Sequence, residues 1–176
     1  MFGFGSQSIL ISIIDSELDF AHKILDFFGK EPGYDLNHYP SFEDFSADFS
    51  GHKRSKKNLH IVLVSLNQEH PNSKYKDAFA VTEMIKTQYP SSEIIIYGEK
   101  DDLQTISLAY DKGAYTFIKQ NENVRLRMHN SVKGIISQKQ FEKKRIDIRN
   151  AIIILGSVVL MAILLFLIYA SKNRLL

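Results

Sequence analysis

Short runs of consecutive apolar residues recur along the first two thirds of the chain and predict buried β-strands. Three of these runs are strong, and they cover residues 8–14, 59–66 and 93–98. Unbroken apolar runs of this kind, rich in Ile, Leu and Val, are typical of parallel strands that are covered on both faces. Two further strands are predicted: residues 34–39, which are weaker in pattern and more polar, and the short segment 115–118.

Between these runs, apolar residues return every three or four positions, which is the spacing of an amphipathic helix. The predicted helices cover residues 18–30, 42–49, 74–88 and 99–112, and a last one begins at residue 124. Asp15 or Ser16 is expected to cap the first helix, and Gly113 to end the fourth. Because strands and helices alternate and crossovers are right-handed, the pattern predicts an α/β fold with a doubly wound parallel sheet.

The most apolar stretch of the chain lies near its C-terminal end. Residues 151–170 are twenty in number, none is charged, and only Ser157 and Tyr169 have polar side chains. A helix of this length spans about 30 Å, the thickness of the hydrocarbon core of a bilayer. A buried core helix is the alternative, but such a helix is normally amphipathic, whereas this one is apolar all round. We therefore expect a single transmembrane helix that anchors the preceding domain at its C-terminal end.

Four parts follow from these patterns. Residues 1–137 are expected to form the α/β domain, 138–150 a polar helical neck, 151–170 the transmembrane helix and 171–176 a short tail. The neck contains no Pro or Gly and is expected to continue the last helix of the domain. Its apolar residues Phe141, Ile146 and Ile148 form no clear heptad, so coiled-coil pairing is not expected.

The charges along the chain are distributed unevenly around a net value of +2. Residues 139–176 carry seven basic and two acidic residues, whereas the rest of the chain is net acidic. Six basic residues flank the apolar run: Lys143, Lys144, Arg145, Arg149, Lys172 and Arg174. The excess before the run, together with an N-terminus that does not resemble a signal peptide, predicts that the domain lies in the cytoplasm. The cluster is expected to attract anionic lipid headgroups rather than nucleic acid, because no groove-reading motif accompanies it.

Three segments of the α/β region resemble the receiver domain of two-component response regulators. SIIDSE resembles the acidic turn after the first receiver strand, IIIYGEKDD the fourth strand with its turn, and KGAYTFIKQ the segment around the fifth strand. The three occur in the receiver order, and the match covers roughly residues 8–138. The resemblance implies a flavodoxin-like (βα)5 fold, a bacterial origin and a phosphorylation site at the carboxyl ends of the strands.

The residues at the expected receiver positions depart from that chemistry. The resemblance implies two acidic metal ligands, an acceptor Asp, a Thr or Ser and a Lys, which together neutralise a transferring phosphoryl group. The corresponding positions here are held by Asp15 and Ser16, Ser65, Gly98 and Gln120. Lys119 lies one residue early, and a small deletion in the alignment would place it at the Lys position.

These departures predict a domain that does not transfer phosphate and is not an enzyme. Ser65 has no visible base, and Asp15 is better explained as a capping residue than as a metal ligand. The chain has no cysteine, and its six histidines show no metal-ligand spacing, so neither a metal nor a cofactor is expected.

The resulting functional hypothesis is a non-catalytic, membrane-anchored pseudo-receiver in a bacterial inner membrane. It would act as a scaffold or accessory subunit of a membrane protein complex. By analogy with receivers, the candidate partner surface includes Tyr110, Lys112 and Tyr115. Two alternatives stay open: a membrane-tethered response regulator that signals through atypical phosphorylation or ligand binding, and an enzyme with a new small-molecule site in the old pocket.

Overall fold

The computed structural model describes residues 9–51, 59–67 and 77–173 of the chain. The chain divides into two compact units, Met1–Gly134 and Ile135–Leu176. The first unit contains the α/β domain, and the second consists of the greater part of one long helix.

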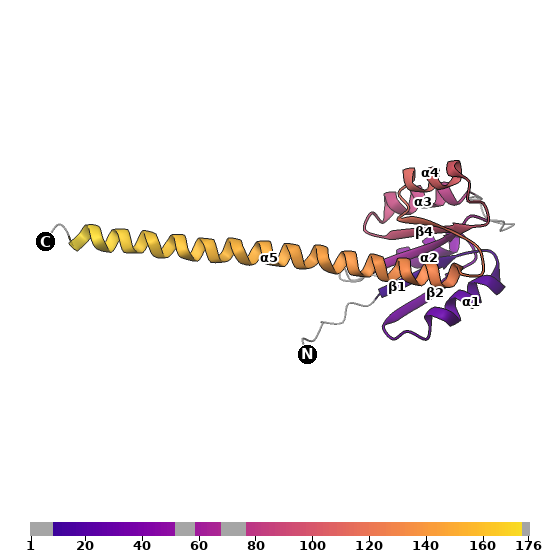
Figure 1. Cartoon of the computed structure of the whole chain (residues 1–176), viewed down its shortest axis with the longest axis horizontal. Coiled ribbons are helices and arrows are strands. Elements are labelled where there is room, and N and C mark those ends of the chain that lie inside the picture. The colour runs from indigo at the N-terminus through magenta and orange to yellow at the C-terminus, as the bar shows by residue number, and fades with distance from the viewer. Residues whose placement is uncertain (1–8, 52–58, 68–76, 174–176) are drawn as a thin grey trace. The chain divides into compact units, whose positions relative to one another are not determined.

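A five-stranded parallel sheet forms the centre of the first unit (Figure 1). Its strands are β1 (Ile9–Ile14), β2 (Tyr34–Tyr39), β3 (Leu59–Ser65), β4 (Glu93–Gly98) and β5 (Thr116–Lys119). They lie in the order β2-β1-β3-β4-β5, and every neighbouring pair is parallel. The doubly wound α/β fold predicted from the apolar pattern is therefore confirmed.

The connections between the strands are helical. They are α1 (Leu18–Phe28), α2 (Phe42–Gly51), α3 (Ala78–Gln88) and α4 (Leu103–Asp111), and α5 (Val124–Asn173) follows β5. Asp77 caps α3 by accepting the amide of Phe79 at 2.9 Å, and Asp102 caps α4 by accepting that of Thr105 at 2.8 Å. The predicted start of the third helix, residues 74–76, lies outside the described residues.

The N-terminus of α1 differs from the expectation. Neither Asp15 nor Ser16 is the N-cap; the capping position is Glu17, whose side chain makes no capping hydrogen bond. Asp15 instead accepts the backbone amide of Glu17 at 3.0 Å, one step before the helix begins. This arrangement is a local Asx turn, and it leaves the second carboxylate oxygen of Asp15 free to reach into the domain.

The two faces of the sheet are covered by different helices. One hydrophobic cluster joins alternate strand residues such as Val62, Val64 and Ile96 to α2, α3 and α4. The intervening strand residues, among them Ile13 and Leu63, are also fully buried and point to the opposite face because strand side chains alternate. On that face, Ala21, Ile24 and Phe28 of α1 and Met128 of α5 are fully buried.

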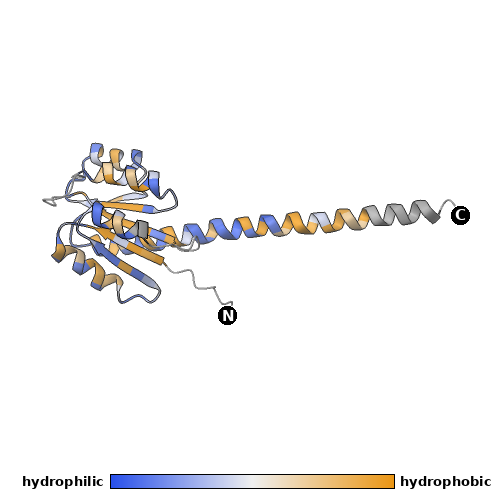
Figure 2. Cartoon of the chain, turned by 180° about the vertical axis from the view of Figure 1, so that it is seen from behind, coloured by the Kyte–Doolittle hydropathy of each residue, from blue (hydrophilic) through white to orange (hydrophobic). Residues whose placement is uncertain are grey.

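Within the second unit, α5 changes from polar to apolar along its length (Figure 2). The side chains of residues 141–163 are all exposed, including seven large aliphatic residues from Ile152 to Leu160 and Ile163 beyond them. By length and composition this helix is long and apolar enough to cross a membrane. An isolated helix is the structure that allows one segment to satisfy its own backbone polar groups in lipid.

Candidate functional site

Three of the residues singled out in the sequence meet at the carboxyl edge of the sheet. Asp15 follows β1, Ser65 ends β3 and Gly98 ends β4, and these strands are direct neighbours. Asp15 is 1% exposed and Ser65 is 3% exposed. The edge where open α/β sheets bind their ligands is therefore buried at this point.

Tyr97, which the sequence analysis did not single out, fills the centre of this edge. It is the penultimate residue of β4, its side chain is fully buried, and it lies opposite Ser65 in the sheet register. Its hydroxyl donates a hydrogen bond of 2.5 Å to Oδ2 of Asp15. The phenol thus reaches from β4 past β3 to the end of β1, over the position where the resemblance places a phosphoryl acceptor.

Within the cluster of Asp15, Ser65 and Tyr97, burial and neighbouring groups shift the pKa values of Asp15 and Tyr97. Burial raises the pKa of the Asp15 carboxyl, although the Tyr97 hydroxyl, the Glu17 amide and the Ser65 hydroxyl each oppose that rise. Burial and then the adjacent negative charge of Asp15 raise the pKa of the Tyr97 phenol well above its ordinary value. Tyr97 is therefore a permanent donor at neutral pH, and its proton is committed to Asp15.

The surroundings of Tyr97 hold the ring in place. The ring of Phe20, from α1, lies 5.6 Å from the Tyr97 ring between centroids. His38 contributes a ring nitrogen 2.9 Å from the backbone oxygen of Asp15, which fixes the turn after β1. Aromatic contact on one side and hydrogen bonds on the other leave the phenol a single well-packed position.

The donor set does not fit a magnesium ion of the receiver type. Both carboxylate oxygens of Asp15 already accept hydrogen bonds, from Glu17 and from Tyr97. The hydroxyl of Ser16 donates to the backbone oxygen of Asn67 at 3.3 Å. Magnesium needs several oxygen ligands in near-octahedral geometry, and here both oxygens of the Asp15 carboxylate are already engaged. Among the described residues, no group of three or more His, Cys, Asp or Glu could hold a metal.

Lys119 and Gln120 lie at the end of β5, outside the buried cluster. Lys119 pairs with Gly98 in the sheet, but its amine forms an ion pair with Asp101 at 3.0 Å, and both side chains are nearly half exposed. Gln120 donates its backbone amide to the oxygen of Gly98 at 2.7 Å. The ammonium group of Lys119 is thus held by the turn before α4.

Gly98 is explained by close packing. A Cβ at this position would lie 2.5 Å from the Cβ of Leu66, the residue that follows β3. The amide of Leu66 donates to the oxygen of Tyr97 at 2.6 Å, which draws the two segments together. The segment after β3 therefore closes over the end of β4, and glycine is required there by space.

The candidate partner residues occupy different environments. Tyr110 is half exposed, with its hydroxyl 3.4 Å from that of Thr116. Tyr115 is partly buried. Lys112 forms an ion pair of 2.6 Å with Glu83 of α3. Leu103, at the start of α4, is 87% exposed, which makes it the most exposed large apolar residue of the described part of the first unit.

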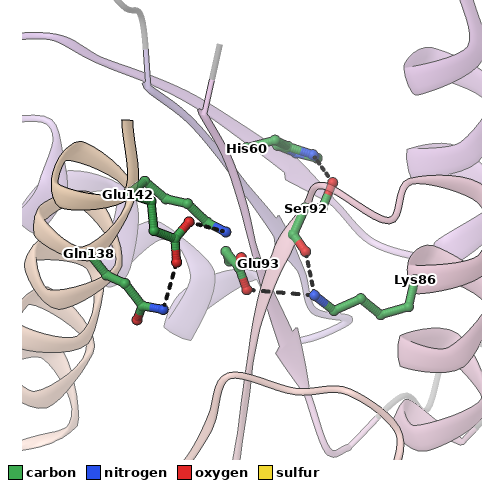
Figure 3. A network of polar contacts seen from close by, with 7 residues as sticks. His60, Lys86, Ser92, Glu93, Gln138 and Glu142 are labelled. Carbon is green, nitrogen blue, oxygen red and sulfur yellow. Dashed lines mark hydrogen bonds and ion pairs between the residues drawn. The ribbon is translucent and has the colours of Figure 1, made fainter. Parts of the chain in front are cut away.

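A second polar cluster lies at the amino ends of the strands (Figure 3). His60 shares hydrogen bonds with the hydroxyls of Ser12, at 3.1 Å, and Ser92, at 2.9 Å, and stacks on Phe45. Lys86 donates to the backbone oxygen of Ser92 at 2.7 Å. A serine beside a histidine can be a nucleophile with its base, but Ser12 is fully buried in mid-strand. The cluster therefore links β1, β3 and the start of β4 through hydrogen bonds.

The parallel sheet, its strand order and the position of the candidate site define a receiver-like fold. No family model matches the chain, and no curated protein matches it in sequence. The similarity to known proteins is structural.

Three solved structures illustrate that similarity. The RcsB response regulator of Salmonella typhimurium superposes with a TM-score of 0.64 at 13% identity, over 75% of this chain and 61% of that chain. A response regulator receiver protein from Pseudoalteromonas atlantica gives 0.59 at 15% identity, over 74% and 98%. A chain of the CheX–CheY–BeF3–Mg²⁺ complex from Borrelia burgdorferi gives 0.60 at 18% identity, over 73% and 89%. This chain spans less than two thirds of the RcsB chain, and likeness at these identities concerns the fold.

Proposed function

We propose that this chain is a membrane-anchored pseudo-receiver that works by binding other proteins and does not transfer phosphate. One observation carries the proposal: the buried phenol of Tyr97 occupies the carboxyl edge of the sheet and is hydrogen-bonded to Asp15. In a receiver, that edge must admit a phosphoryl group together with a metal ion. Here the chain's own side chain takes the place of both.

The residue at the acceptor position supports the same reading. Ser65 is buried, and its hydroxyl lies 3.3 Å from the backbone amide and 3.5 Å from the backbone oxygen of Asn67. A serine becomes a nucleophile when a base removes its proton. The carboxylate of Asp15 lies beside Ser65, but its two oxygens already accept hydrogen bonds from Tyr97 and Glu17.

The C-terminal helix supports the anchoring part of the proposal. Its exposed apolar residues would face water in a soluble protein, whereas in a bilayer they face lipid tails. The basic residues before the apolar run favour an orientation with the receiver-like domain on the cytoplasmic side. For a receiver-like protein, the corresponding compartment is the inner membrane of a bacterium.

The partner surface we propose is the exposed side of α4 with the adjoining end of the sheet. Leu103 and Tyr110 present apolar surface there, and the ion pair of Lys112 with Glu83 adds charged groups at its border. Exposed aromatic and aliphatic residues with a charged rim are typical of transient protein interfaces. The partners we propose are the subunits of a membrane assembly.

The experiment that tests the missing phosphotransfer uses the full chain in mild detergent with Mg²⁺. The chain is treated in turn with labelled acetyl phosphate and with beryllofluoride. The positive control is the CheY protein of Borrelia burgdorferi, whose complex with CheX, BeF3 and Mg²⁺ is one of the similar structures. We expect no covalent label and no beryllofluoride-dependent shift in the unfolding temperature. Stoichiometric labelling of Ser65 or Asp15 would refute the proposal and favour a tethered response regulator that still signals.

A further inference from the structure

The segment of α5 that precedes the apolar run carries an unusual number of exposed positive charges. Residues 139–150 contain five basic and two acidic residues. The side chains of Lys143, Lys144, Arg145 and Arg149 are all exposed. No ion pair is recorded for any of these four within the described part of the chain. We call these four residues the basic collar.

The basic residues of the collar are spread around the helix and do not share one face. Successive residues of an α-helix project about 100° apart, so Lys143, Lys144 and Arg145 point in three directions. A helix that lies flat on a membrane gathers its basic residues on one face, between the polar and apolar sides. A ring of charge is what a helix needs when it crosses a headgroup layer and meets lipid on every side.

The acidic residue nearest the collar is already engaged on its N-terminal side. Glu142 accepts a hydrogen bond from Gln138 at 3.1 Å and forms an ion pair with Lys139 at 3.6 Å (Figure 3). Its charge is therefore directed away from the collar and largely compensated. Asp147 is the one acidic residue inside the collar, so the four basic residues outnumber it.

The distances along the helix place the collar within the headgroup layer and just outside it. At 1.5 Å per residue, Arg149 lies about 3 Å before Ala151, where the apolar run begins, and the other three collar residues lie about 9 to 12 Å before it. The headgroup region is about 6 Å deep on each side of the hydrocarbon core. Long basic side chains can also bend toward that layer while their stems stay on the helix.

From this placement we propose that the basic collar binds the phosphodiester groups of anionic lipids, so that the protein gathers these lipids around its neck. The inference rests on the membrane anchoring proposed above and adds the class of lipid. Charge complementarity identifies the occupant, since the collar is positive and adjoins the apolar run directly. A zwitterionic lipid surface offers no net charge for it to neutralise.

The test uses the full chain reconstituted into vesicles of phosphatidylcholine with a minor fraction of phosphatidylglycerol. The vesicles are washed with alkaline carbonate, the protein is extracted with its nearest lipids by a styrene–maleic acid copolymer, and both lipids are quantified. We expect phosphatidylglycerol to be enriched at least about twofold around the protein relative to the vesicle, and raised salt to reduce the enrichment.

The decisive variant replaces Lys143, Lys144, Arg145 and Arg149 with Gln. Its matched control replaces four exposed basic residues of the first unit with Gln: Lys23, Lys30, Lys100 and Arg125. The collar variant is expected to lose the enrichment, and the control is expected to keep it.

The outcomes separate this inference from the anchoring on which it rests. A chain that leaves the vesicles in carbonate overturns the anchoring. A retained chain whose surrounding lipid matches the bulk vesicle overturns the collar inference and leaves the anchor intact. Enrichment that survives in the collar variant also overturns the collar inference.

Discussion

At the scale of single residues, the hydrogen bond between Tyr97 and Asp15 is the interaction on which the closed site depends. Replacing Tyr97 with Phe keeps the ring in its aromatic packing and removes one hydroxyl, which leaves Oδ2 of Asp15 buried without its donor. An unsatisfied buried acceptor costs about 1–3 kcal/mol, and more when it is charged. We expect a loss of stability of at least that size, measured by urea unfolding of the full chain in mild detergent.

The matched control is Tyr110→Phe, because the Tyr110 hydroxyl is exposed and lies 3.4 Å from its partner. Its effect should stay within about 0.5 kcal/mol, as for ordinary surface changes. Equal losses in the two variants would show that Asp15 does not depend on the phenol.

Asp15 itself should give a pH-dependent result. Its pKa is raised in the folded state, chiefly by burial, so the folded chain holds this proton more tightly than the unfolded chain. Stability from this group is therefore full below the unfolded pKa, near 3.8, and declines as the pH rises through the folded pKa. Asp15→Asn removes the charge, and its amide can donate to the Tyr97 oxygen while its carbonyl accepts from Glu17.

Because the amide does not titrate, we expect the stability of Asp15→Asn relative to the parent to rise between about pH 4 and neutral pH, by about 1 kcal/mol, the usual scale for one buried polar group. The gain should shrink as the pH falls toward 4, and it is measured by urea unfolding at a series of pH values. A gain that is constant with pH would show that Asp15 does not titrate between the two states.

At the scale of elements, the end of β4 is packed directly against the segment that follows β3. Gly98→Ala would place a methyl group 2.5 Å from the Cβ of Leu66, so one of the two segments must move. Overpacking of this kind costs about 1–3 kcal/mol. We expect that loss, with faster amide hydrogen exchange in β4 as the local readout.

Gly134→Ala in α5 is the control for a glycine without such a constraint. The nearest atom to its added Cβ is the Tyr115 hydroxyl oxygen at 3.5 Å, which is an ordinary contact. Alanine is favoured over glycine within a helix by about 1 kcal/mol, so this variant should be more stable. If both variants lost stability alike, the clash at Leu66 would not be the cause.

These elements also show what the sequence could predict. The strands were predictable because a strand covered on both faces must be apolar at every position, and β3 is buried along its whole length. The prediction that Asp15 or Ser16 caps the first helix was wrong, because Glu17 occupies the capping position. The Asp15 side chain instead makes a tertiary hydrogen bond to Tyr97, which the local sequence does not reveal.

Tyr97 was missed for a different reason. In the sequence it is one more β-favouring residue in an apolar strand, and its role appears when register places it beside Ser65. Strand alternation offers a partial clue, since Tyr97 and Ile95 must share a face of the sheet. The reach of its hydroxyl across β3 to Asp15 depends on three-dimensional packing that the pattern alone does not contain.

At the scale of the whole molecule, the proposed anchor depends on the energy of placing residues 151–170 in lipid. A charged residue at the centre of a transmembrane helix costs about 3 kcal/mol on insertion scales. Leu160→Arg combined with Ile163→Arg puts two such charges near the middle of the run. We expect the parent chain to stay in the membrane pellet after alkaline carbonate extraction and the double variant to be released in large part.

A matched pair of substitutions outside the run separates insertion from a general effect of added charge. Leu18 and Leu126 are each 54% exposed, as is Ile163, but both belong to the receiver-like unit. Leu18→Arg combined with Leu126→Arg adds the same charge where the side chains already meet water, so membrane retention should not change. Release of both double variants would point to a peripheral attachment through the first unit. Release of neither would show that the apolar run tolerates charge, because protein and not lipid surrounds it.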